Sequence, residues 1–231
     1  MKHPILVLIY TWAVPYAVLA DSISGTVNGS DGSIITSGLV TAYQTMAATS
    51  LRPRSTPTSA LVLPDGTFQF GALAEGTYTV CARAPLTAWL GSCEWGSPGS
   101  TVSLMQTKPS AVVRIVLTRG ALIAVRVSDP TGLLTANEAK TPGGHLLVGV
   151  GMDSLVFLNA AIVSQDSAGR TYQVVVPFDR AVRISVASAF FGLSDVTGKA
   201  LPKFGNVIPV LVPSGQPPPT VFLNVTGTIK P

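Results

Sequence analysis

The sequence predicts an all-β protein made of two tandem β-sandwich domains. Short segments in which apolar and polar residues alternate recur along the chain, as in half-buried strands. Turn signals rich in Gly, Asn, Asp and Pro separate these segments. Only 11% of the 231 residues are charged, against roughly 25% in typical soluble domains. This low charge, together with 22 Gly and 18 Pro, favours strands and tight turns over exposed helices.

The N-terminus has the layout of a secretory signal peptide. Lys2 precedes a mostly apolar run over residues 5–20, and Val18-Leu19-Ala20 suits cleavage before Asp21. An uncleaved anchor is the alternative, but this run is shorter than the roughly 20 residues that span a bilayer. We therefore expect a signal over 1–20, no transmembrane segment after its cleavage, and a secreted, periplasmic or cell-envelope protein.

Residues 21–118 are predicted to form the first β-sandwich. Turns are expected at residues 28–32, 64–66 and 75–76, and residues 47–59, rich in Thr, Ser, Pro and Arg, are expected to be a flexible surface loop. The predicted strands are 23–27, 39–43, 67–70, 77–82, 101–105 and 111–118.

Residues 119–231 are predicted to form a second sandwich with a Pro-rich C-terminal segment. Pro209 suits an edge strand or a bulge, because it cannot donate to a central ladder. The predicted strands are 121–129, 145–151, 155–163, 171–176, 180–188, 206–212 and 220–227.

An internal echo links the two halves. Residues 65–70, DGTFQF, are matched by residues 169–174, GRTYQV, and a further strand follows each. Two repeats of one fold type would produce this echo, with a boundary near residues 118–120. Two unrelated antiparallel domains that share hairpin chemistry would also produce it.

Four motifs in residues 22–82 carry a family resemblance. They are Gly25-Thr26-Val27, the strand 39–42, Asp65-Gly66-Thr67-Phe68 and the segment 73–80. Their order resembles that of the carboxypeptidase regulatory-like domain, a transthyretin-like (prealbumin-like) β-sandwich close to collagen-adhesin B-type repeats. The resemblance implies an Ig-like or prealbumin-like sandwich of a secreted bacterial type. It implies little about function, because these modules are attached to many secreted bacterial proteins.

The composition argues against most catalytic chemistry. The chain beyond the signal holds one histidine, His145, whereas zinc sites need three or four ligands and a Ser-His-Asp triad needs its own histidine. We therefore expect no catalytic residue, no metal site and no cofactor. The basic residues are scattered around a net charge of +4, so a nucleic-acid partner is not expected.

The stretch 78–95, YTVCARAPLTAWLGSCEW, holds the only two cysteines. In an exported chain, an even cysteine number outside a C-x-x-C spacing predicts a disulfide between Cys81 and Cys93. The loop that it closes either covers a sandwich edge or presents aromatic side chains to a ligand. Trp89, Trp95 and the neighbouring Glu94 are therefore the candidate binding residues.

These observations predict a non-catalytic exported protein. Its expected role is a binding or adhesion module for a carbohydrate or protein ligand at the cell envelope. A structural spacer or envelope assembly subunit is the alternative, and a hydrolase that uses Glu94 is a remote one. The sequence leaves the oligomeric state open.

Overall fold

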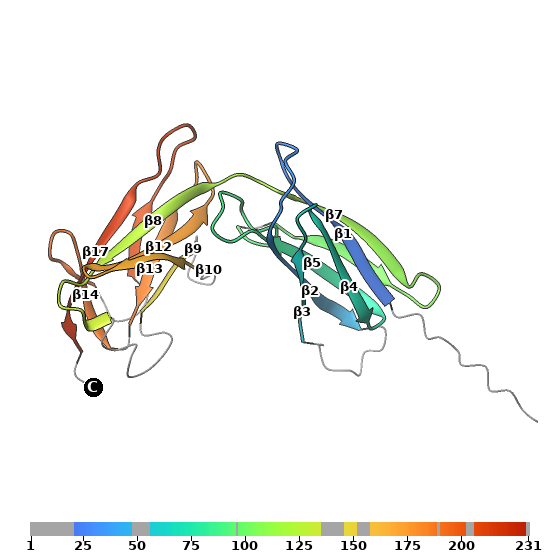
Figure 1. The fold of residues 1–231 in the computed structure, drawn as a ribbon, viewed down its shortest axis with the longest axis horizontal. Helices are drawn as coiled ribbons and strands as arrows, with labels where there is room; N and C mark the ends of the chain where they lie inside the picture. The colour runs from blue at the N-terminus through green and yellow to red at the C-terminus, as the bar shows by residue number, and fades with distance from the viewer. Residues whose placement is uncertain are drawn as a thin grey trace, which may run out of the picture.

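The computed structural model describes residues 21–47, 56–95, 97–134, 146–151, 158–188, 190–201 and 206–229. All seventeen named elements in these ranges are strands, and they form two β-sandwiches that lie side by side (Figure 1). The predicted all-β class with two tandem sandwiches is confirmed. The predicted signal (1–20) and His145 lie outside the described residues. The described residues contain no helix with the length and hydrophobicity that crossing a membrane requires.

The first sandwich packs a three-stranded sheet, β4-β1-β7, on a four-stranded sheet, β3-β2-β5-β6. The central strand β1 pairs antiparallel with β4 and parallel with β7. The strands of the first sandwich are β1 (Asp21–Gly29), β2 (Gly38–Ala47), β3 (Thr58–Val62), β4 (Thr67–Leu73), β5 (Gly76–Arg83), β6 (Ser100–Leu104) and β7 (Ser110–Leu117).

Alternation along β1 and β4 builds the first core. Ile23 and Val27 point inward from β1, and Phe68 and Phe70 point inward from β4 with their rings edge to face, 5.8 Å between centroids. Gly25 lies between the two β1 residues, where a Cβ would stand 1.9 Å from the Val113 carbonyl oxygen. Only glycine lets the three strands approach this closely.

The second sandwich packs a six-stranded sheet, β11-β12-β8-β17-β14-β15, on a four-stranded sheet, β10-β9-β13-β16. A separate core of mostly aliphatic side chains fills it. Its strands are β8 (Ala121–Ser128), β9 (Leu147–Gly151), β10 (Leu158–Asn159), β11 (Ala161–Asp166), β12 (Gly169–Val176), β13 (Val182–Ala187), β14 (Phe191–Asp195), β15 (Ala200–Leu201), β16 (Asn206–Val210) and β17 (Thr220–Thr228).

The two sandwiches share one strand topology. The order β4-β1-β7 corresponds to β12-β8-β17, and β3-β2-β5-β6 corresponds to β10-β9-β13-β16. In both, the central strand is antiparallel to one neighbour and parallel to the last strand. The sequence echo falls on the equivalent strands β4 and β12, which pair with β1 at Ile23↔Phe70 and with β8 at Ile123↔Val174. Strands β11, β14 and β15 are additions to the second sandwich.

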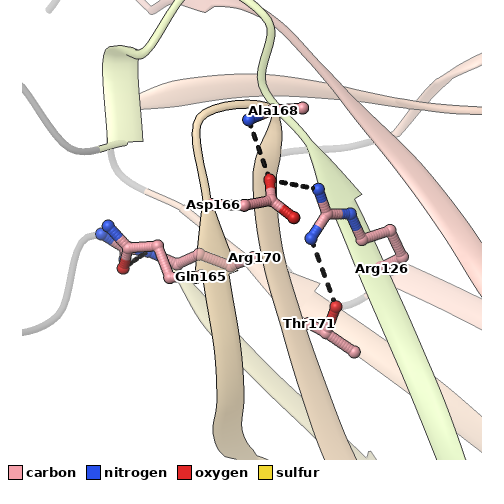
Figure 2. A network of polar contacts seen from close by, with 6 residues as sticks. All are labelled: Arg126, Gln165, Asp166, Ala168, Arg170 and Thr171. Atoms are coloured by element: carbon pink, nitrogen blue, oxygen red, sulfur yellow. Dashed lines mark hydrogen bonds and ion pairs between the residues drawn. The ribbon is translucent and has the colours of Figure 1, made fainter.

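A polar network links β11, one of these additional strands, to β8 and β12 (Figure 2). Arg126 on β8 pairs through Nη2 with Asp166 Oδ1 at 2.7 Å and donates from Nη1 to Thr171 Oγ1 at 3.3 Å. The Ala168 N–H donates to the same Asp166 oxygen at 2.8 Å. The Arg126 hydrogen bond is the main reason that the pKa of Asp166 lies below its usual value.

The structure differs from the sequence prediction at four places. In the segment predicted as one strand, 155–163, the described residues fall on two strands, β10 and β11, which belong to different sheets. Three further strands also differ. Strand β3 begins inside the segment predicted as a flexible loop, and β14 and β15 were not predicted. Each is short, and two of them lie at the edge of a sheet, where one side of the strand stays open to solvent and alternation is weak. On β3, Leu61 is 70% exposed, so an apolar residue stands where the pattern calls for a polar one. Pro209 lies on the edge strand β16, as predicted.

Strands β7 and β8 are joined by a short connector, residues 118–120. Leu117 ends β7 and Ala121 begins β8, on either side of the predicted boundary between residues 118 and 119. The division of the chain into domains 21–118 and 119–231 stays a prediction.

Candidate functional site

The stapled loop, residues 84–95, leaves β5 at the junction of the two sandwiches. Cys81 on β5 and Cys93 form a disulfide with 5.4 Å between their Cα atoms, which confirms the predicted bridge. Ser92 adds two hydrogen bonds to Ala82, one from its N–H and one to its Oγ, each of 2.9 Å. Because β6 pairs with β5 only as far as Val80, Ser92 takes over the edge of β5 beyond that point.

The middle of the stapled loop pairs with the connector. The Leu90 N–H donates to the Thr118 carbonyl at 2.9 Å, and the Gly120 N–H donates to the Ala88 carbonyl at 2.8 Å. A Cβ on Gly120 would stand 2.4 Å from the Val176 carbonyl oxygen at the end of β12. The connector therefore runs between the stapled loop and the second sandwich, and glycine makes the room for it.

Trp89 belongs to the first sandwich. Its ring is part-buried against the first core, and a Cβ on Gly29 would stand 2.4 Å from one of its ring carbons. The Arg119 guanidinium lies over the ring, 4.9 Å from its centroid, and pairs with Asp31 at 3.4 Å. Hydrogen bonds from Ser33, first from its side chain and then from its backbone, lower the pKa of Asp31, and the Arg119 charge adds to the effect.

Trp95 belongs to the second sandwich, although its loop is rooted in the first. It is 8% exposed and packs in the second core. Its carbonyl oxygen accepts a 2.9 Å hydrogen bond from Arg180 Nη1. The backbone φ of Trp95 is +59°, a left-handed conformation that costs a bulky residue about 1–3 kcal/mol and persists only where its surroundings hold it. Its indole N–H is buried and finds no partner among the described residues.

Glu94 lies between Trp89 and Trp95 in the sequence. Its side chain is 10% exposed and forms an ion pair with Arg83 Nε at 2.6 Å, although its Oε1 receives no well-aligned hydrogen bond. A Cβ on Gly91 would strike the carboxyl group at 2.5 Å, so glycine makes room for it. Glu94 is thus held by its own loop and by the end of β5.

Two hollows flank the stapled loop, and Glu94 lines both. The smaller, about 70 Å³, lies between the loop and strands β8, β10, β11 and β12, with Trp89 and Leu86 in its wall. The larger, which we call the junction hollow, has a volume of about 310 Å³. It is lined by Leu90, Gly91, Ser92, Glu94, Trp95, Ser97, Val116, Thr118, Arg119, Pro177, Phe178 and Arg180.

The structure thus brings all three candidate residues to one junction. It places the loop between the two sandwiches, with Ser92 on the edge of β5. A binding role for Trp89, Glu94 and Trp95 stays a prediction. Sequence reasoning missed Arg119, Phe178 and Arg180, because nothing in their local pattern indicates contact with residues 84–95.

Few side chains at this junction could take part in catalysis. Glu94 is the only carboxylate among the described residues that line either hollow. Elsewhere in the described ranges, no group of three or more His, Cys, Asp or Glu side chains is placed to hold a metal ion. The remote hydrolase alternative therefore lacks a second carboxylate beside Glu94 in these hollows. The expected absence of a metal and a cofactor stays a prediction.

A third and larger hollow, about 800 Å³, lies beside the β14–β15 hairpin, β16 and β17. Its wall is mostly apolar and includes Val196, Leu211 and Phe222. The alternation of apolar and polar residues did not indicate this hollow, because the strands β14 and β15 were themselves not predicted.

Comparison with known proteins shows no family for this chain. No protein-family model matches it, and no curated protein does. Solved structures give distant matches. A streptococcal ancillary pilin matches over 90% of this chain and 63% of its own at 9% identity and a TM-score of 0.42. The shaft pilin SpaA of Lactobacillus rhamnosus GG matches over 92% and 100% at 10% identity and 0.35. A DUF3823 family protein of Bacteroides uniformis matches over 84% and 100% at 13% identity and 0.31.

The chain therefore spans less than two thirds of the length of the ancillary pilin. Similarity at these identities and TM-scores indicates no function. The carboxypeptidase regulatory-like resemblance stays a prediction on its own motifs.

Proposed function

We propose that this protein is a non-catalytic structural module of the cell exterior or envelope that holds two β-sandwiches in one fixed arrangement. The observation that supports this most is the stapled loop. The loop is covalently tied to β5 of the first sandwich at Cys81, and it places Trp95 in the core of the second. Because the loop is attached to both sandwiches, it holds them in a fixed relative position.

Adjacent domains in one chain usually move relative to each other unless the contact between them is large and apolar. Here Trp89 packs against the first core, while Leu90 and Trp95 pack against the second. The ladder between residues 88–90 and the connector adds backbone hydrogen bonds. These contacts oppose bending at the junction, which is the property a spacer needs.

The position of the tryptophans favours the structural role over adhesion through displayed indole rings. The Trp95 ring is buried, and the Trp89 ring is part-buried with the Arg119 guanidinium over its face. A partner would have to displace these contacts to reach either ring. A disulfide suits the oxidising compartment that the predicted signal implies.

Nuclear magnetic relaxation of the backbone amides tests this proposal. A rigid pair of sandwiches tumbles as one elongated body, so amides of both should fit a single diffusion tensor. Two separate tensors, with each sandwich tumbling at the rate of a body half the size, would overturn the proposal.

A binding role is the second candidate, and the junction hollow favours it. The hollow combines cationic, aromatic and hydroxyl side chains in one place. Its chemistry suggests a class of ligand that does not require the indole rings to be exposed.

A further inference from the structure

We propose that the junction hollow binds a small oxyanion, a carboxylate or a phosphate ester about the size of one sugar. The inference goes beyond the structural role but rests on the fixed arrangement of the two sandwiches, because Val116 of the first and Phe178 and Arg180 of the second all line the hollow. It rests on two arginines, on the charge balance around them and on the size and lining of the hollow.

The two arginines reach the hollow from different segments. Arg119 comes from the connector, and Arg180 comes from the turn that follows β12. Both guanidinium groups have donors to spare in the described structure, because Arg119 uses Nε toward Asp31 and Arg180 uses Nη1 toward the Trp95 carbonyl. Guanidinium forks match the spacing of carboxylate and phosphate oxygens, so these remaining donors suit an oxyanion.

Other contacts hold both groups in place before any ligand arrives. Arg119 is fixed by the Trp89 ring and by Asp31, and Arg180 is fixed by its hydrogen bond to a buried residue. Arginines that are already ordered lose less side-chain entropy on binding. The same contacts that hold the sandwiches together therefore prepare the site.

The charge balance favours an anion. Glu94 is the only acidic residue in the described lining, and it already forms its ion pair with Arg83, which does not line this hollow. Arg180 has no acidic partner within 4.0 Å among the described residues. Arg119 is paired with Asp31, so Arg180 is the cation in the described lining that no described acidic side chain neutralises.

The remaining wall sets the size and shape of the ligand. Trp95, Phe178 and Leu90 supply apolar surface, and Ser97 and Thr118 supply hydroxyl groups. A volume of about 310 Å³ is at the lower end of the range for small-molecule sites, roughly 300–1,000 Å³. One sugar-sized ring with a charged group fits such a space, whereas a chain of several rings exceeds it.

Calorimetric titration of the full oxidised protein tests the site with three probes that share one hexose ring. These are D-glucuronate, glucose 6-phosphate and uncharged glucose. We expect one or both anions to bind at least ten-fold more tightly than glucose. We also expect the affinity to fall as sodium chloride is raised, because exposed charges are screened at high ionic strength. The anion that binds more tightly shows whether the site prefers a carboxylate or a phosphate ester.

Variants locate the binding. Arg180→Ala and Arg119→Ala should each weaken anion binding at least ten-fold, while Arg183→Ala removes an exposed arginine from β13 outside the hollow and should leave it unchanged. Arg180→Lys keeps the charge and a donor for the Trp95 carbonyl, so it guards against a folding defect and should bind between the parent and the alanine variant. The proposal is overturned if neither anion exceeds glucose, or if folded Arg119 and Arg180 variants bind like Arg183→Ala.

Discussion

Arg180 donates a 2.9 Å hydrogen bond from Nη1 to the carbonyl oxygen of Trp95. The bond joins a turn of the second sandwich to a loop rooted in the first, between residues 85 positions apart in the chain. The bond holds the backbone of Trp95, which is the one aromatic residue with a left-handed φ in the described part of the chain. The loop that ends at Trp95 is therefore part of both sandwiches.

Trp95 should matter for stability through its ring volume and not through its indole N–H. Trp95→Ala should lower the free energy of unfolding by about 3–5 kcal/mol, because it empties space in the second core. Trp95→Phe keeps much of the ring and removes a buried donor whose lack of a partner costs about 1–3 kcal/mol. Its loss should stay below about 2 kcal/mol by denaturant unfolding. Equal losses for the two variants would contradict this account.

The disulfide should stabilise the fold. Replacing both Cys81 and Cys93 with alanine should lower the free energy of unfolding by about 3 kcal/mol, since the bridge restricts the unfolded chain over a short loop. Guanidinium unfolding with and without reductant measures this. The double variant is the control, because reductant should leave its midpoint unchanged. A parent protein that is also insensitive to reductant would contradict the role of the staple.

Gly25 should tolerate no side chain. Gly25→Ala should destabilise the protein by about 3 kcal/mol, because its Cβ would meet the Val113 carbonyl at 1.9 Å and the Phe68 ring at 2.9 Å. Gly71→Ala on the neighbouring strand β4 is the matched control, since nothing lies within 4 Å of its Cβ. Thermal unfolding of the two variants should separate them clearly, and equal melting temperatures would show that β1 and β7 are not this close.

Asp166 should titrate below its usual range. Its pKa is lowered from 3.8 mainly by Arg126, so this pair stabilises the fold above pH 3.8, and the stabilisation is lost as pH falls through the lower folded pKa. Carboxyl titration by nuclear magnetic resonance measures this shift. Arg126→Met, which keeps the apolar stem, should move the pKa of Asp166 up toward 3.8. An unchanged pKa in that variant would remove Arg126 as its cause.

Period-two alternation was enough to predict most strands of both sandwiches. It works for β1, β8 and β12 because one face of each strand is buried in a core and the other is half-exposed. It fails for β3 and β15, which are short edge strands, and for β14, a short strand next to that edge. Their place in a sheet depends on partners far away in the sequence.

The disulfide could also be predicted, because the cysteine number, the cysteine spacing and the predicted signal are all read from the sequence alone. The burial of Trp95 could not. It depends on a second core that forms from residues 121–223 and on a hydrogen bond from Arg180. No local pattern around residue 95 records these long-range contacts, so the choice between a core and a surface tryptophan required the structure.

The distance between the two sandwiches tests the central claim most directly. Spin labels on unnatural side chains at the exposed positions Gln69 and Lys199 avoid the native cysteines and report on the first and second sandwich. Pulsed electron resonance on the parent protein should give one narrow distance distribution, and Trp95→Ala should broaden it while both sandwiches stay folded. A broad distribution in the parent, or a narrow one that Trp95→Ala leaves unchanged, would contradict the claim that the stapled loop holds the two sandwiches together.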